Sequence, residues 1–220
     1  MSANSGGKAG YHHGNLRNAL IRAAVELAAD GGPEKVVLRE AARRVGVSPT
    51  AAYRHFAGQA ELLHAVKIHG QQALADSMEK AADEAPRSTD PGEAAELRLS
   101  AIGRGYIRFA LAQPGLYRSA FCPPVAGEGE ARGEWTGVAA PGDDPEYRAF
   151  VLLTGALDAL VAAGRMPERN RPAAEAAAWA GVHGLSLLIL DGPMRHLPDA
   201  ERDAVIERTL KMIVSGMMAP

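Results

Sequence analysis

The chain has 220 residues, of which 47% are hydrophobic and only 5% aromatic, and its formal net charge is −2. This length can bury a large core in one domain or in two small ones. No apolar run approaches the roughly 18 residues that span a bilayer, and the polar first ten residues do not form a secretory signal. The single cysteine, Cys122, excludes an internal disulfide framework. We therefore expect a cytoplasmic protein without membrane association, and the alanine- and leucine-rich composition favours an all-α fold.

The charges are distributed unevenly along the chain. Residues 1–70 contain nine lysines and arginines against five acidic residues, together with five of the seven histidines. The remaining 150 residues contain 15 basic and 21 acidic residues. A basic N-terminal part on an acidic body indicates a polyanionic partner for the first part alone. On charge alone, an ordinary solvated surface is the alternative.

The N-terminal part predicts three short helices. Apolar residues at helical spacing predict the first helix, which ends at residues 31–33, Gly-Gly-Pro: Leu16, Leu20, Ala23, Ala24 and Leu27. A second helix is expected over 38–45, and Gly46 permits a tight turn after it. Ser48 can cap a third helix over about 49–56, in which Pro49 takes the favoured first position. Because Ala42 and Ala52 are small, these two helices can cross closely, as in a helix-turn-helix.

The third helix places its side chains unevenly. A helix turns about 100° per residue, so Arg54 points outward, with Tyr53 and His55 at either side of it. Ala52 and Phe56 then point inward. This arrangement suits a helix that lies in a groove between two walls of negative charge.

The rest of the chain predicts further helices, over about 59–82, 93–112, 145–164, 172–190 and 199–216. The 93–112 helix should end at residues 113–115, Gln-Pro-Gly. The connection over 122–145 is rich in glycine and proline, and a connection of this length is a pocket lid or simply a mobile loop. The last two helices carry apolar stripes, which serve either the core or an interface between copies: Trp179, Val182, Leu187, Leu190, Ile206, Leu210, Ile213 and Met217.

Three segments, YHHGNLRNALIRAAVELAADGG, LREAARRVGVSP and TAAYRHFAGQAELLHAV, resemble the TetR family of transcriptional regulators. Trp179, His183 and Gly184 are similar to the Trp-x-x-x-His-Gly signature of a ligand-sensing C-terminal domain in that family. The resemblance implies a DNA-binding domain over 1–60, with an N-terminal arm and a helix-turn-helix, and an effector-binding and dimerisation domain over 61–220. It also implies a homodimer, paired through the last two helices, that binds palindromic DNA.

The resemblance implies that the third helix enters the major groove of DNA. Tyr53 and His55 would then hold phosphates, while Thr50, Ala51 and Arg54 face the bases, and Arg54 suits a bidentate contact with guanine. A partly buried Tyr53 and a merely solvated His55 are the alternatives. The other residues expected at the DNA are Ser48, Pro49, Arg39, Arg17 and the arm residues Lys8, Tyr11, His12 and His13.

Two positions depart from the family pattern. Val37 stands where a serine or threonine normally caps the second helix, and the loss of such a cap typically costs about 1 kcal/mol. Gln59 stands where the family has lysine, and the loss of one phosphate contact should lower the salt slope of DNA binding by about 0.9. Neither departure changes the expected fold or function.

An effector site is expected in the body. Trp179 and His183 lie four residues apart on one helix face and could line a cavity with Tyr106 and Phe109. The alternative is a tryptophan packed over a hydrogen-bonded core histidine. The sequence has no cofactor motif, and His12-His13 lacks a third metal ligand. We therefore expect no cofactor and no metal, and a neutral or weakly polar effector.

With these features, the resemblance implies a ligand-responsive transcriptional repressor that a small molecule releases from its palindromic operator. The alternatives are a helical DNA-binding protein without effector control and, with less support, a helical enzyme. An enzyme would need a nucleophile with a base, and Ser186 or Cys122 beside His183 has no supporting spacing. We therefore do not expect an enzyme.

Overall fold

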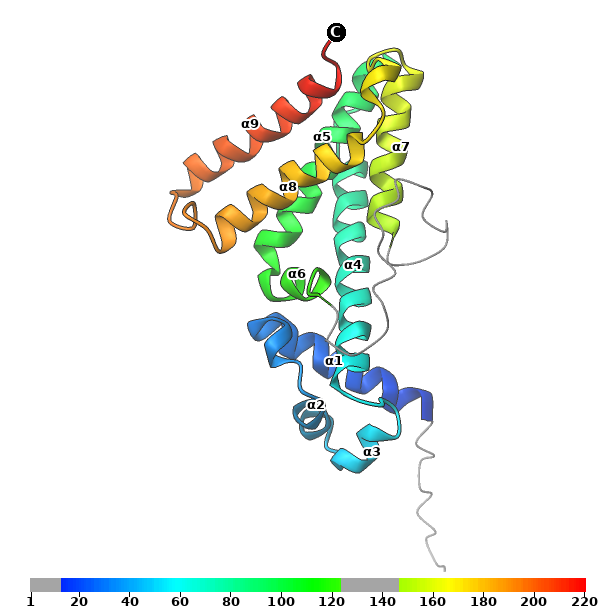
Figure 1. Cartoon of the computed structure of the whole chain (residues 1–220), viewed down its shortest axis with the longest axis vertical. Coiled ribbons are helices and arrows are strands. Elements are labelled where there is room, and N and C mark those ends of the chain that lie inside the picture. Colours follow the sequence, from blue (N-terminus) through cyan, green and yellow to red (C-terminus); the bar gives the residue numbers. More distant parts are fainter. Residues whose placement is uncertain (1–12, 124–146) are drawn as a thin grey trace, which may run out of the picture.

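The computed structural model describes residues 13–123 and 147–220, and within these ranges every regular element is a helix (Figure 1). The all-α fold class is therefore confirmed. The N-terminal helices are α1 (His13–Gly31), η1 (Pro33–Lys35), α2 (Leu38–Val45) and α3 (Pro49–Tyr53). The body consists of α4 (Gln59–Asp83), α5 (Pro91–Ala112), α6 (Pro114–Ala120), α7 (Arg148–Ala162), η2 (Glu168–Asn170), α8 (Ala174–Leu190) and α9 (Asp199–Met217). None of these helices has a stretch long and apolar enough to span a bilayer.

Helices α1, α2 and α3 form a small bundle, here called the head. Its core consists of alanine and larger apolar side chains, and Ala42 of α2 and Ala52 of α3 are fully buried. Small side chains at this contact let the two helices approach closely, as the helix-turn-helix prediction required. Gly46 makes the turn between them with φ 77°, a left-handed conformation that favours glycine.

Helix α3 begins as expected but ends early. The Ser48 side chain accepts a hydrogen bond from the Ala51 N–H at 3.2 Å, and Pro49 takes the first helical position. The helix was expected to reach Phe56 but ends at Tyr53. The amides of Arg54 and His55 bond to carbonyls three residues back, which tightens the last turn and stops the α-helix.

The amino end of α2 lacks a side-chain cap, as the sequence predicted. Val37 occupies the cap position in an extended conformation, and its side chain has no polar group to offer. The backbone carbonyl of Val37 accepts from Glu40 and Ala41 instead. The helix nevertheless starts at Leu38, where it was expected.

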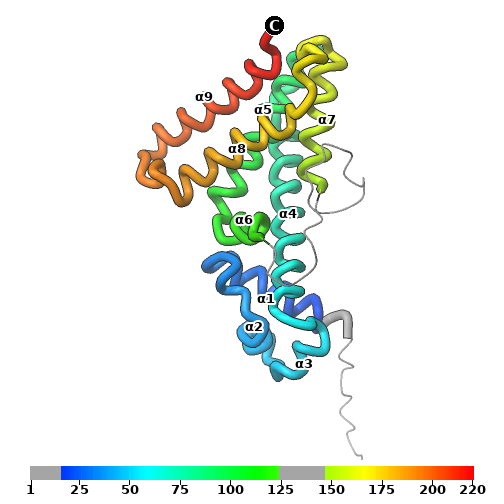
Figure 2. Tube along the Cα trace, in the orientation of Figure 1, coloured from blue at the N-terminus to red at the C-terminus, as the bar shows by residue number. Residues whose placement is uncertain are grey.

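Helix α4 runs from the head through the length of the body (Figure 2). Near its start it packs against α1, and along the rest of its length it packs against α5, α6 and α7. The expected domain boundary between residues 60 and 61 therefore falls in the first turn of a continuous helix, and it stays a prediction. Helices α8 and α9 lie antiparallel beside each other and pack on α5 (Figure 1).

Helix α6 was not predicted. We read residues 113–115 as the end of the preceding helix, but Pro114 is the first residue of a new one. Gly115 allows α6 to pack directly against the carboxyl end of α1. A Cβ at this position would overlap the carbonyl oxygens of Ala28 and Ala29. The expected connection over 122–145 falls almost entirely outside the described residues.

Candidate nucleic-acid interface and effector site

The outer surface of α3 carries side chains suited to DNA. Thr50 and Arg54 are exposed and so is Tyr53, at 48% of its maximum, whereas Ala52 and Phe56 on the opposite side are buried. The expected inward and outward sides of this helix are therefore confirmed, and the interpretation of Tyr53 as a partly buried core residue is wrong.

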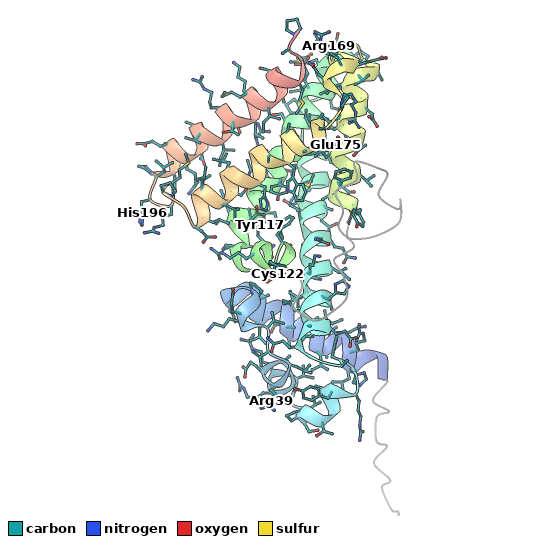
Figure 3. The ribbon with its side chains drawn as sticks, in the orientation of Figure 1. Arg39, Tyr117, Cys122, Arg169, Glu175 and His196 are labelled. Carbon is teal, nitrogen blue, oxygen red and sulfur yellow. The ribbon has the colours of Figure 1, made fainter. Side chains whose placement is uncertain are left out.

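The other expected DNA residues of the turn and the third helix also lie at this surface. Ser48 and Pro49 are exposed at the amino end of α3, while Ala51 and His55 are half-buried. Arg39 is exposed in the first turn of α2 (Figure 3). Lys8, Tyr11 and His12, expected in the N-terminal arm, lie outside the described residues.

Two further arginines of α2 are held in ion pairs on the surface of the head. Arg43 makes a two-point contact with Glu40, at 2.8 and 2.6 Å. Arg44 contacts Asp30 of α1 at 3.0 Å. These pairs balance positive charge on one side of the head, and they leave Arg39 and Arg54 as exposed cations near α3.

Arg17 makes contacts within the head that the sequence did not predict. One nitrogen of its guanidinium donates to the His55 carbonyl at 2.6 Å and to the Glu61 carboxylate at 3.0 Å. The guanidinium also lies 4.3 Å from the centre of the Phe56 ring. These contacts tie Arg17 to the rest of the head, but 41% of its side chain stays exposed, so the expected phosphate contact stays a prediction.

A cluster of five ring side chains joins three elements of the body, and we call it the aromatic cluster: Tyr106 of α5, Tyr117 and Phe121 at α6, and Trp179 and His183 of α8. His183 is at its centre. The hydroxyls of Tyr106 and Tyr117 lie 2.7 and 2.8 Å from the same nitrogen, His183 Nδ1. Tyr117 points from α6 towards α8 (Figure 3).

The polar groups of the aromatic cluster hydrogen-bond to one another. Trp179 Nε1–H donates to the Tyr106 oxygen at 3.1 Å. His183 Nδ1 accepts from a tyrosine hydroxyl or donates to one, according to the tautomer of the ring. Burial lowers the pKa of His183 and raises the pKa of both Tyr106 and Tyr117. The cluster is therefore uncharged at neutral pH.

Three of the four expected effector-site residues meet in this cluster: Tyr106, Trp179 and His183. Phe109 is buried in the core, and none of the ring contacts among the described residues includes it. Tyr117 and Phe121 were missed because α6 was missed. Their signal was Pro114 at a helix start, followed by two aromatic residues four apart.

The model for tetracyclin repressor-like C-terminal domains matches residues 99–213, more than half of the chain. The model for bacterial regulatory proteins of the tetR family matches residues 20–66, which include α2, α3 and the start of α4. The chain belongs to the TetR family of transcriptional regulators. The head is its DNA-binding region.

Solved structures agree with this TetR-family fold. A protein of unknown function from Rhodococcus sp. RHA1 is 25% identical, with a TM-score of 0.72, over 96% of this chain and 100% of that one. A TetR family transcription regulator from Marinobacter aquaeolei VT8 is 18% identical, with a TM-score of 0.59, over 93% of this chain and 96% of that one. At that identity the second likeness shows the fold alone. No curated protein matches the regulator.

Proposed function

We propose that the regulator is a repressor that binds a palindromic operator as a homodimer and releases it when a small molecule binds at the aromatic cluster. The observation that carries the sensing part is that Tyr117 hydrogen-bonds to His183 from the same short helix that rests on α1. The exposed side of α3 carries the DNA-binding part.

At the operator, α3 lies in the major groove with Arg54 towards the bases. Its guanidinium donates two hydrogen bonds to one guanine, while Thr50 and Ala51 contact neighbouring base edges. Tyr53 and His55 hold phosphates on either side, helped by Arg39 and by the backbone at Ser48 and Pro49. Phosphate contacts set the register, so that Arg54 always meets the same base position.

The effector signal reaches the head through α6 and α4. An effector that separates Tyr117 from His183 shifts α6, and α6 contacts both the carboxyl end of α1 and the middle of α4. Helix α4 then acts as the lever that moves the two heads beyond groove spacing. A ligand releases DNA only if it binds the non-DNA conformation more tightly, and coupling of about 1–3 kcal/mol gives roughly a 5–150-fold change in affinity.

The aromatic cluster favours an uncharged, planar effector. It offers ring faces, two neutral tyrosine hydroxyls and a neutral histidine, so a charged group would lose its hydration without an opposite charge. The Trp-x-x-x-His-Gly pattern of Trp179, His183 and Gly184 belongs to the same proposal, as the mark of a sensing subtype of the family.

The homodimer forms through the last two helices. Leu187 and Leu188 of α8 and Met212 of α9 are exposed, and they make up half of the exposed large apolar side chains among the described residues. Apolar side chains gathered on two adjacent helices indicate an interface. A two-fold axis through α8 and α9 would pair them with their copies as a four-helix bundle and set two α3 helices side by side.

Selection of bound duplexes from a random DNA pool tests the DNA-binding part directly. We expect an enriched palindrome with half-sites about 34–36 Å apart, or a multiple of one helical turn. Enrichment of a single half-site, or of no sequence, would contradict the proposal. The selected duplex then serves as the probe in every affinity measurement below.

The effector part requires a compound that lowers affinity for that duplex. Neutral planar aromatic compounds can be screened by quenching of Trp179 fluorescence in a Trp135→Phe background, followed by duplex-binding assays. His183→Ala should alter release by the compound while sparing duplex affinity without it. If the variant keeps its thermal stability but loses DNA binding outright, His183 does not act through an effector. If it loses both, the packed core histidine is the correct interpretation.

A further inference from the structure

Arg17 and Glu61 join three elements of the head at one point. Arg17 lies in α1, Glu61 lies in the first turn of α4, and the His55 carbonyl follows the last turn of α3. One guanidinium nitrogen of Arg17 donates to both His55 O and Glu61 Oε1, at 2.6 and 3.0 Å. Because the guanidinium also covers the Phe56 ring, the carboxyl end of α3 is held from two sides.

Glu61 extends this contact into the connection between α3 and α4. Its second carboxylate oxygen, Oε2, accepts the backbone N–H of Ala57 at 2.7 Å. The Ala57 amide, and then Arg17, hold the pKa of the Glu61 carboxyl below its usual value. Glu61 is therefore ionised at neutral pH, with one oxygen on α1 and the other on the chain that leaves α3.

Helix α3 needs such support because it is short. It has only five residues, and its last turn is tightened. Ser48 caps its amino end, and Ala52 and Phe56 bury one side of it. Helix α3 also packs on α2, but it has little direct packing on α4, so the contacts at its carboxyl end are what join it to α4.

We propose that Arg17 and Glu61 are positioning residues for DNA reading, a latch that ties the angle of α3 to the first turn of α4. The proposal rests on the DNA-binding function above. When the Arg17–Glu61 contact is formed, the outward side of α3 is already oriented for the major groove of DNA. A displacement of α4 moves Glu61 and, through Arg17, the end of α3, so the latch also carries the effector signal to the recognition helix.

The sign of the effect separates this role from simple electrostatics. Glu61 is an acidic residue near a surface that binds a polyanion, so charge alone predicts tighter DNA binding when it is neutralised. The latch predicts weaker binding, because fewer heads hold α3 at the reading angle and apparent affinity falls with the competent fraction. Arg17→Lys separates the two explanations in the same way. Lysine keeps the positive charge, but it lacks the planar group that stacks on Phe56 and donates to two acceptors.

The experiment measures affinity for the selected duplex and for a scrambled duplex, at several salt concentrations, with thermal unfolding of each variant. Glu61→Gln and Arg17→Lys should each weaken binding of the selected duplex by about 3–10-fold, through the smaller competent fraction. The salt slope should stay unchanged. The double variant should be little weaker than either single one, because both remove the same contact. Glu34→Gln and Arg22→Lys, exposed residues of the same part of the chain, are the matched controls and should bind normally.

Tighter or unchanged binding by Glu61→Gln would overturn the proposal. The proposal would also be overturned if Arg17→Lys bound normally and Arg17→Met lowered the salt slope by about 0.9. That pattern identifies a contact between Arg17 and a phosphate. If Glu61→Gln unfolds below the assay temperature, the affinity of Arg17→Lys for the selected duplex tests the proposal by itself. A wild-type protein that selects no duplex would refute the DNA-binding function itself, which is a separate result.

Discussion

At the scale of single residues, Tyr53 is the last residue of α3 and Arg54 follows it directly, but the two are expected to have different roles. Both are exposed on the outward side of the helix. In the proposed complex, Arg54 faces a base edge and Tyr53 faces a phosphate. A base contact carries sequence information and a phosphate contact does not, so substitutions at the two positions should be distinguishable by specificity rather than by affinity alone.

We expect Arg54→Ala to cost about 1–3 kcal/mol at one base position, the value of a bidentate arginine–guanine contact. Tyr53→Phe should weaken binding to all duplexes alike. The measurement is affinity for the selected duplex and for its single-base variants. An unchanged base preference in Arg54→Ala would show that Arg54 does not face the bases.

His183 should make the stability of the regulator depend on pH. Burial lowers its pKa in the folded state below the ordinary value of 6.5. As pH falls below that value, the unfolded chain takes up a proton that the folded chain resists, so stability is full above about 6.5 and declines below it. His183→Asn keeps an acceptor for the tyrosine hydroxyls without titrating in this range.

The expected result is a smaller loss of stability between pH 7.5 and 5 in His183→Asn than in the wild type, measured by denaturant unfolding. His196, an exposed histidine between α8 and α9, provides the control. His196→Asn should keep the wild-type pH dependence. Identical pH profiles for wild type and His183→Asn would mean that His183 is solvated in the folded protein.

At the scale of elements, α6 links the aromatic cluster to the head. It has seven residues, yet it contacts α1, α4 and α5, and it supplies Tyr117 to His183. Its fit against α1 depends on Gly115, which has no room for a side chain beside Ala28 and Ala29. Small movements in the aromatic cluster therefore have a direct route to the backbone of α1.

Gly115→Ala should destabilise the regulator by about 1–3 kcal/mol, the usual cost of overpacking, and should shift α6 away from α1. Gly155→Ala is the matched control, because no described atom lies within 4 Å of a Cβ built at that exposed position of α7. It should stabilise its helix by about 0.5–1 kcal/mol. Thermal and denaturant unfolding measure the stability of both variants. Equal stability would contradict the close packing of α6 against α1.

At the scale of the whole molecule, the proposed dimer depends on exposed apolar residues of α8 and α9. Met212 on α9 is 66% exposed and Leu188 on α8 is 41% exposed. A charge introduced at the centre of an apolar interface cannot be compensated there. The proposed dimer through α8 and α9 should therefore fail when either residue becomes glutamate.

Leu188→Glu and Met212→Glu should sediment as monomers at micromolar concentration and lose affinity for the two-half-site duplex. Val151→Glu on α7 replaces a comparably exposed apolar residue, 44% exposed, and should stay dimeric. If Val151→Glu were the only one of the three variants to become monomeric, the dimer interface would lie on α7 instead. A monomeric wild type would remove the two-fold arrangement altogether.

The sequence by itself determined the features that depend on neighbouring residues. The helix-turn-helix was predictable because its signals are local: apolar spacing in α1 and α2, glycine at the turn, and Ser48-Pro49 at the start of α3. The inward and outward sides of α3 followed from helical geometry alone. Helix α6 was missed because a proline–glycine pair can end one helix or begin the next, and the local pattern does not distinguish the two. The end of α3 was missed because the apolar spacing continues to Phe56, whereas the backbone changes to hydrogen bonds three residues back after Tyr53.

The tertiary structure decided every contact between residues far apart in the chain. The sequence did not show that Arg17 contacts Glu61, 44 residues away, and the carbonyl of His55. Tyr117 meets His183 across 66 residues, and Phe109 lies outside the ring contacts although it is only three residues from Tyr106. Periodicity predicts which side of a helix is buried, but the partner on that side depends on how the helices cross, and crossing is a property of the packed molecule.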